Sequence, residues 1–433
     1  MKVFKNVNIV TCDQEFKVYL QGMMAIKGDK IVYVGDVDPS WEEHASEVED
    51  GQNAWIMPGL VNVHTHSAMT LLRGISDDEN LHKWLEETIW PAEARFTTDI
   101  TTNAVKLALV EMLKSGTTTF NDMYNPTGVD IHQIHQVVSQ SGMRCFFSPT
   151  LFSHPGETTA ETIRRTRRII EDILGFEDPH FRVMVAPHAP YSCEKDLLQA
   201  SVQLAKELDL PIHIHVVETT DESQMMIERT GKRPLAYLEE LGFLKQKGVF
   251  AHSLDLTKDE IELLGKSPVS VAHNPISNLK LASGIAPVVE LMQAGVDLGF
   301  ATDSVASNNN LDLFEEARTA AFLQKMKHGD ARKFPVSSVL QTMTLGGAKA
   351  LGLDHEIGSL EVGKQADFLI IQPEKKAHLY PTYHMLSHLV YAAKGSDVDH
   401  VYIAGRQVVK DGKVLGLDEE TLFLDIQKLG LIK

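Results

Sequence analysis

The middle of the chain alternates short apolar segments with longer amphipathic ones, and this alternation constrains the fold more than any other feature. Between the apolar segments, apolar residues recur at helical spacing, as at Ala104, Ala108 and Met112, before Gly116 supplies a stop. Eight such repeats over about 300 residues predict an α/β fold, a TIM-like (β/α)8 barrel. A doubly wound open sheet is the alternative, but no GxGxxG motif follows the first strand. The expected strands cover residues 60–65, 117–121, 144–148, 182–187, 211–216, 248–251, 269–272 and 296–301.

Both ends of the chain carry β-strand signals instead. Strand-like runs near the amino end, "KVFKNVNIVT" and "MMAIKGDKIVYVGD", are matched by "GSLEVGKQADFLIIQP" and "DHVYIAGRQVVKDGKV" near the carboxyl end. Turn signals at Gly28, Gly405 and Gly412 separate the strands within these runs. We therefore expect residues 1–55 and 355–433 to combine into one small β-sandwich domain, beside a catalytic barrel of residues 56–354.

Composition narrows the class of partner and the compartment. The 433 residues include 41 basic and 59 acidic ones, for a formal net charge of −18. Nucleic acid and anionic membranes both require a basic face, so we expect neither as a partner. Cys12, Cys145 and Cys193 form no CxxC pair, and no apolar run approaches the roughly 20 residues of a membrane helix. These features fit a soluble protein of the reducing cytoplasm.

Polar residues stand where the expected strands end. Side chains alternate faces along a strand, so His64 and His66 in "PGLVNVHTHS" point the same way. This pair alone fits either two core histidines bonded to carbonyl groups or half of a metal site. If the 19 histidines were placed at random, five of the eight strand ends would rarely each carry a histidine. The observed placement therefore favours the metal site. The strand-end residues are His64, His66, His188, His213, His215, Glu218, His252, His273 and Asp303.

The strand-end residues predict one zinc ion. Zinc takes nitrogen and carboxylate ligands, and a catalytic site keeps a position for water. His215 lies nearer the carboxyl end of its strand than His213, so we predict His215 as the ligand and His213 as either a histidine that supports the ligands or a core histidine. No lysine ends the fourth strand to bridge a second metal, and Fe²⁺ or Mn²⁺ would also suit such a site. The predicted ligands are His64, His66, His215 and Asp303.

Several segments together resemble a known family. "PGLVNVHTH", "HIHVVET", "AHNPISNLKLASG", "ATDSVASNNNLDLFEE" and "GSLEVGKQADFLII" are similar to the amidohydrolase superfamily. "WPAEARFT", "APHAPYSC" and "SNNNLDLFEE" resemble its 5-methylthioadenosine/S-adenosylhomocysteine deaminases, with related deaminases and chlorohydrolases sharing them in part. The resemblance covers nearly the whole chain and implies hydrolysis of the 6-amino group of an adenine nucleoside, giving the inosine derivative and ammonia.

The resemblance also implies catalytic roles. Bound zinc lowers the pKa of its water toward about 7, and Asp303 would accept the water's proton and return it to the amine. Glu218, three residues after His215, would protonate ring nitrogen N1, and His252 would stabilise the attacking hydroxide. The alternatives are a solvent-facing loop carboxylate at Glu218 and a core histidine at His252.

Further residues are implied as substrate contacts. Glu93 of "WPAEARFT" would bind the ribose hydroxyls, His188 would also contact the substrate, and Trp84 would line the pocket. Glu93 is alternatively an acid at a helix amino terminus, and Trp84 is alternatively an ordinary core or surface residue. His273 either donates to the base or braces its own strand.

One segment departs from the family pattern. Family members often carry an arginine in a segment like "SRTLFS", where it suits a substrate carboxylate, but this chain reads "SPTLFS" with Pro149. Proline offers neither charge nor N–H, which argues against a strong preference for S-adenosylhomocysteine. Arg144 of this chain, or an arginine of a neighbouring subunit in a homo-oligomer, is the candidate replacement.

Other functions share this pattern of residues. A deaminase or chlorohydrolase of guanine, a pterin or a triazine would use the same metal ligands, and a zinc-dependent amide or lactam hydrolase is a third possibility. A catalytically silent family member should have lost ligands, whereas all four are present here.

Overall fold

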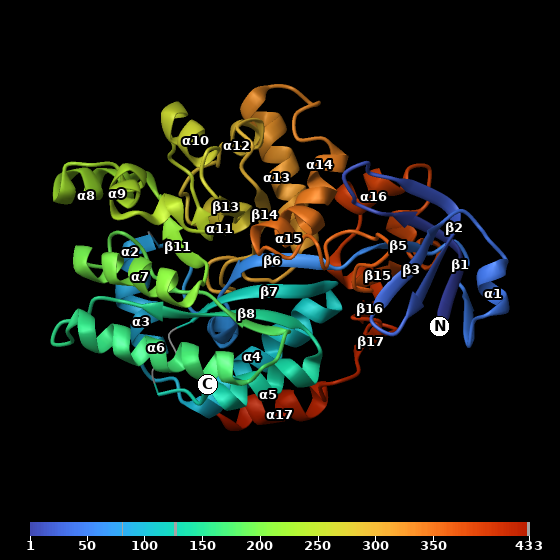
Figure 1. Ribbon diagram of the computed structural model, residues 1–433, viewed down its shortest axis with the longest axis horizontal. Coiled ribbons are helices and arrows are strands. Elements are labelled where there is room, and N and C mark those ends of the chain that lie inside the picture. The colour runs from blue at the N-terminus through green and yellow to red at the C-terminus, as the bar shows by residue number, and fades with distance from the viewer. Residues whose placement is uncertain (80, 125–127, 431–433) are drawn as a thin grey trace.

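A computed structural model describes residues 1–79, 81–124 and 128–430 (Figure 1). Its central part contains two parallel sheets. In the first sheet, β6 pairs with β7, β7 pairs with β8, and both β9 and β10 pair with β8. In the second sheet, β11, β12, β13 and β14 pair in that order. Isolated parallel bridges link the two sheets, from Val185 to Ile212 and from Thr65 to Asp303. These strands are β6 (Leu60–Thr65), β7 (Thr117–Tyr124), β8 (Arg144–Leu151), β9 (Phe181–Val183), β10 (Ala186–Pro187), β11 (Ile212–Val216), β12 (Gly248–His252), β13 (Val269–His273) and β14 (Leu298–Phe300).

This curled parallel arrangement confirms the predicted α/β class, and the strand expected at 182–187 is divided into β9 and β10. Helices follow the strands, and no helix among the described residues combines the length and apolar character needed to cross a membrane. The central helices are α2 (Leu81–Trp84), α3 (Trp90–Glu93), α4 (Thr98–Lys114), α5 (Ile131–Ser141), α6 (Thr159–Gly175), α7 (Lys195–Leu208), α8 (Thr220–Thr230), α9 (Pro234–Leu241), α10 (Lys258–Leu264), α11 (Pro275–Lys280), α12 (Val288–Gln293), α13 (Leu313–His328), α14 (Val336–Gln341) and α15 (Gly347–Ala350).

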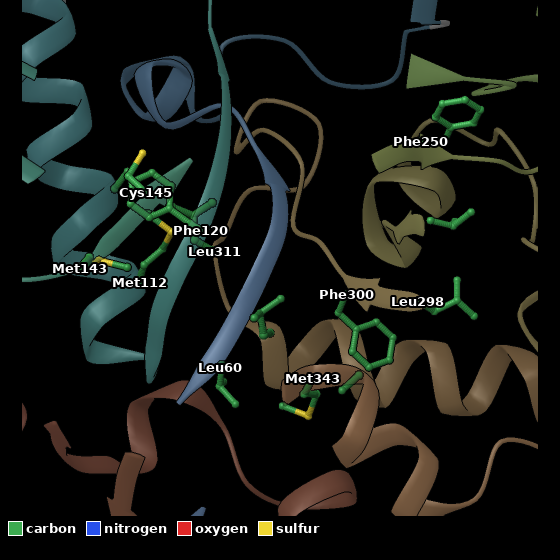
Figure 2. Packing of buried hydrophobic residues seen from close by; sticks show 14 of the residues in the cluster. Leu60, Met112, Phe120, Met143, Cys145, Phe250, Leu298, Phe300, Leu311 and Met343 are labelled. Carbon is green, nitrogen blue, oxygen red and sulfur yellow. The ribbon is translucent and has the colours of Figure 1, made fainter. Parts of the chain in front are cut away.

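The main core lies between the strands and the surrounding helices. Phe120 of β7 is paired with Cys145 of β8, and both belong to one buried cluster with Met112 of α4 (Figure 2). Leu60 and Phe300 bring β6 and β14 into the same cluster. Burying these side chains removes apolar surface from water and fixes the strand positions. The strand ends that carry the predicted polar residues are therefore supported by close packing.

Strands from both ends of the chain form a single hydrogen-bonded sheet at one end of the molecule (Figure 1). β15 pairs antiparallel with β5, placing Ile370 opposite Ile56, and Phe368 stacks on Tyr402 with ring centroids 4.5 Å apart. The expected sandwich of two sheets is not confirmed, since the path β18-β17-β16-β15-β5-β1-β2-β3 is continuous and β4 pairs with β1. The elements here are β1 (Lys2–Val10), β2 (Val18–Lys27), β3 (Lys30–Gly35), α1 (Ser40–Glu43), β4 (Glu47–Asp50), β5 (Trp55–Pro58), β15 (Phe368–Ile371), α16 (Met385–Tyr391), β16 (Val398–Ile403), β17 (Arg406–Lys410), β18 (Lys413–Val414) and α17 (Glu419–Lys428).

Arg144 connects the two parts of the fold and does not reach the substrate cavity described below. It is the first residue of β8, its side chain is buried, and its guanidinium is bound to Asp367 and Gln365, which precede β15. The expectation that Arg144 contacts substrate is therefore wrong, because the start of a strand lies at the opposite end from the strand-end histidines. Arg144 forms a buried ion pair that links β8 of the central part to the segment before β15 of the terminal sheet.

Replacing Arg144 by alanine is expected to lower the free energy of unfolding by about 3–5 kcal/mol, because Asp367 would remain buried without its counter-ion. Urea denaturation followed by circular dichroism measures this change. Arg332→Ala, which removes the exposed partner of Asp330, is the control and should leave the stability unchanged within error. Equal effects of the two substitutions would contradict the structural assignment.

Candidate active site

The carboxyl ends of β6, β11 and β12 bring four predicted histidines together. The ring centroid of His64 lies 4.8 Å from those of both His66 and His215, and the ring centroid of His215 lies 5.6 Å from that of His252. Candidate ligand atoms of His64, His215 and His252 lie within 4.8 Å of one another, as do those of His64, His66 and Asp303. The two groups share His64, so they surround a common position.

Hydrogen bonds hold these rings from outside the cluster. His66 Nδ1 donates to the Met123 carbonyl at 2.7 Å, and His215 Nδ1 donates to the His188 carbonyl at 2.8 Å. His64 Nδ1 is 2.8 Å from His213 Nε2, so His213 lies behind His64. Each bonded Nδ1 leaves Nε2 facing the cluster, and partners of this kind orient histidine ligands in metal sites.

Unpaired buried atoms test whether a metal would fit. The Nε2 atoms of His64 and His252 are buried and have no hydrogen-bond partner among the described residues. Burial lowers the pKa of His64 to about 4 and that of His215 well below its usual value, so both rings are neutral at pH 7. Neutral imidazole nitrogens without partners are suitable ligands for a divalent metal.

Asp303 presents its two carboxylate oxygens to different surroundings. Oδ1 lies 3.4 Å from His64 Nε2 and 3.3 Å from His66 Nε2. Oδ2 accepts hydrogen bonds from Ser277 Oγ at 2.6 Å and Ser307 Oγ at 3.0 Å. Burial alone would raise the pKa of Asp303, but the electrostatic interactions with nearby His64 and His66 outweigh burial and hold this pKa well below its usual value. Asp303 is therefore an ionised carboxylate with one oxygen directed at the histidines.

A second carboxyl group faces the same space. Glu218 is buried, and its Oε1 lies 3.7 Å from Nε2 of His252, whose Nδ1 donates to Asn278 Oδ1 at 2.9 Å. Burial raises the pKa of Glu218, which favours its protonated form. Val217, His252 and Asp303 have φ angles of 52°, 73° and 60°, a conformation that costs energy in residues other than glycine and is common at functional sites.

Residues of this cluster line a cavity. They are His66, His215, Glu218 and Asp303, and the predicted residues Glu93, His188 and Trp84 line the same cavity. Burial raises the pKa of Glu93 to about 7, although nearby His66 acts in the opposite direction. Sequence reasoning assigned no role to several apolar and aromatic residues of this lining, although Trp90, Phe152, Tyr191 and Leu281 lie in motifs that it had singled out. The missed residues include Met69, Leu81, Trp90, Phe152, Tyr191 and Leu281.

Two predicted features fall outside the cavity. His273 ends β13 and is buried, but it does not line the cavity, so a direct contact with the base has no support here. Pro149 lies within β8 opposite Tyr124, and its neighbour Thr150 lines the cavity in its place. No lysine or arginine lines the cavity in the part of the chain that the structure describes. The cavity therefore offers carboxylates, imidazoles and apolar side chains.

Comparison with known proteins identifies the class. The model of the amidohydrolase family matches residues 55–408, and the chain belongs to this family. A protein named 5-methylthioadenosine/S-adenosylhomocysteine deaminase, from Bacillus cereus (strain 03BB102), is 44% identical over 426 residues, which cover 98% of each chain. A relative of the same name from Bacillus cytotoxicus is 43% identical over 98% of each chain.

Solved structures agree with this family. The crystal structure of a zinc-bound adenosine deaminase from Xanthomonas campestris matches with a TM-score of 0.93 and 35% identity, covering 99% of this chain and 97% of that one. Atrazine chlorohydrolase from Arthrobacter aurescens matches with a TM-score of 0.90 at 22% identity, covering 99% of this chain and 100% of that one. At that identity, the second match concerns the fold alone.

Proposed function

We propose that this protein is a zinc-dependent hydrolase that converts 5-methylthioadenosine or adenosine, and less readily S-adenosylhomocysteine, to the inosine derivative and ammonia. The observation that carries the proposal is that His64, His66 and Asp303 converge beside one cavity, which His66, Asp303 and Glu218 line. The Bacillus relatives named for this activity support the substrate class. The zinc-bound relative from Xanthomonas campestris supports the metal.

The proposed metal ligands are the inward Nε2 atoms of His64, His66 and His215 and Oδ1 of Asp303. Three nitrogens and one oxygen suit zinc, and Fe²⁺ or Mn²⁺ would also be accepted. A bound zinc ion supplies Lewis acidity that lowers the pKa of a coordinated water toward about 7. His213 contributes by holding the His64 ring in place.

The proton transfers fall to the protein side chains. Glu218, whose protonated form burial favours, donates to ring nitrogen N1 and so makes C6 of the adenine easier to attack. Asp303, an ionised carboxylate beside the proposed metal position, accepts a proton from the attacking water and passes it to the departing amine. His252 Nε2 hydrogen-bonds the attacking oxygen beside Glu218.

The cavity sides hold the nucleoside in this proposal. Glu93 accepts hydrogen bonds from the ribose hydroxyls, and His188 contacts the sugar from the end of β10. Ser192 Oγ, 2.7 Å from His188 Nδ1, holds the His188 ring, which stacks on Phe152 at 4.4 Å. Trp84, at the end of α2, packs against the nucleoside as part of the cavity lining.

The lining predicts which 5′ substituent is preferred. We expect kcat/KM for 5-methylthioadenosine to exceed that for S-adenosylhomocysteine by at least about tenfold. A substrate carboxylate would find no lysine or arginine among the described lining residues, and burying it unpaired costs more than about 1.4 kcal/mol of binding free energy. Ammonia release by the zinc-loaded enzyme, with both substrates, adenosine and guanine at matched concentrations, measures this preference. Equal rates for the first two substrates would contradict it, and turnover of guanine alone would overturn the proposed function.

The proposal extends to the organisation of the chain. We propose that residues 56–354 close into a (β/α)8 barrel and that residues 1–55 and 355–433 form the composite small domain, although β5 crosses that boundary. We also propose a cytoplasmic homo-oligomer acting on a small molecule and water, without nucleic-acid or membrane partners. The net charge of −18 and three buried free cysteines support this.

A further inference from the structure

The peptide unit between Val217 and Glu218 is held at both ends. The Val217 carbonyl accepts a hydrogen bond from Leu254 N–H at 3.0 Å. On the other side of the same peptide plane, Glu218 N–H donates to Glu222 Oε2 at 2.8 Å. Val217 has a φ of 52°, which is an outlier for a β-branched residue and has to be maintained by its surroundings. These two hydrogen bonds set the direction in which the Glu218 side chain leaves the backbone.

The Glu222 side chain does not make the hydrogen bond that is usual for a glutamate at its position in α8. Thr219 caps this helix by accepting the Glu222 N–H at 3.1 Å, so Glu222 is the third residue of the helix. In a capping box, the glutamate at this position would accept the backbone N–H of the capping residue in return. Glu222 accepts the N–H of Glu218, one residue earlier, although only 1% of Glu222 is exposed. Burying a carboxyl group is costly, so a specific contact has to compensate for it.

We propose that Glu222 is a positioning residue for Glu218: by accepting the Glu218 backbone N–H, it maintains the left-handed turn at Val217 and keeps the Glu218 carboxyl beside His252. This inference rests on the proposed function, in which Glu218 is the proton donor. Glu222 itself does not line the cavity and touches no substrate. Its contribution is to the geometry of a proton transfer, which is sensitive to displacements of about 1 Å.

Two substitutions separate hydrogen-bond acceptance from charge. Burial raises the pKa of Glu222 to about 8, so the group is mostly neutral at pH 7 and glutamine mimics it closely. Glu222→Gln keeps a carbonyl oxygen for the Glu218 N–H and is expected to retain kcat within about threefold. Glu222→Leu fills the space without an acceptor and is expected to lower kcat by about 10- to 100-fold, with KM within threefold and zinc content unchanged. Glu228→Leu, at an exposed carboxylate of the same helix, is the control and should leave kcat unchanged.

Crystal structures of the two variants provide a readout that does not depend on turnover. Glu218 should stay beside His252 in Glu222→Gln and move away in Glu222→Leu. Wild-type kcat in Glu222→Leu, an unmoved Glu218 there, or a loss of more than tenfold in Glu222→Gln would overturn the proposal. If Glu222→Leu does not fold, Glu222→Gln still decides by its kcat. If the wild-type enzyme deaminates neither 5-methylthioadenosine nor adenosine, the proposed function fails. The crystallographic comparison of the two variants still tests the role of Glu222 in the turn.

Discussion

Replacing Asp303 by asparagine is expected to reduce kcat for 5-methylthioadenosine by at least about 10³-fold and to lower the zinc content below one ion per chain. The asparagine keeps the shape of the side chain but removes the negative charge that faces His64 and His66 through Oδ1. It also removes the group proposed to take up the proton of the attacking water. Steady-state ammonia release and inductively coupled plasma mass spectrometry measure the two effects on the same preparation.

A matched control distinguishes this loss from general damage. Asp330→Asn changes a half-buried aspartate that is paired with Arg332 and does not line the cavity, and it should leave both activity and zinc content unchanged. A variant Asp303→Asn that keeps full zinc content and more than a tenth of wild-type kcat would contradict the role proposed for Asp303.

The second large effect is expected for Glu218→Gln, with a loss of about 10²- to 10⁴-fold in kcat and little change in zinc content. Glutamine preserves hydrogen bonding at this buried position but cannot donate a proton to N1. Because burial raises the pKa of Glu218, the protonated form of the wild-type enzyme persists above the usual range of a carboxyl group, and activity should fall as the pH rises through that pKa. The variant should lack this dependence, which a pH profile of kcat will show.

Glu228→Gln serves as the control for Glu218→Gln, since Glu228 is exposed on α8 and accepts a hydrogen bond only from Gln224 among the contacts of the described residues. It should behave like the wild type at every pH. If Glu218→Gln instead lost zinc in proportion to activity, its role would be in metal binding, and the proposed proton transfer would be wrong.

Features that depend on local sequence periodicity were predictable. Apolar runs indicated the strands, and apolar residues at helical spacing indicated the helices between them. The alternation of side chains along a strand placed His64 and His66 on the same face. The choice of His215 over His213 used the same local reasoning, and the structure places His215 with the candidate ligands and His213 behind His64. The resemblance to a family then supplied roles for Glu93, His188 and Glu218, all of which line the cavity.

Features that depend on distant pairing were not predictable. Arg144 pairs with Asp367, which lies 223 residues further along the chain. No feature of the sequence near either residue indicates this contact. Phe152 and Leu281 come from separate segments that only the folded chain brings to one cavity. The continuous path of the terminal sheet also depends on which strand edges meet.

The sequence by itself therefore determined the α/β class, the strand ends and the residue types available for metal binding and proton transfer, because these depend on neighbours within a few positions. Only the tertiary structure decided which of those side chains face one another, which ion pairs are structural and how Glu222 holds the Glu218 backbone. Such contacts join atoms from separate elements, and packing of the whole core, rather than local propensity, sets their distances.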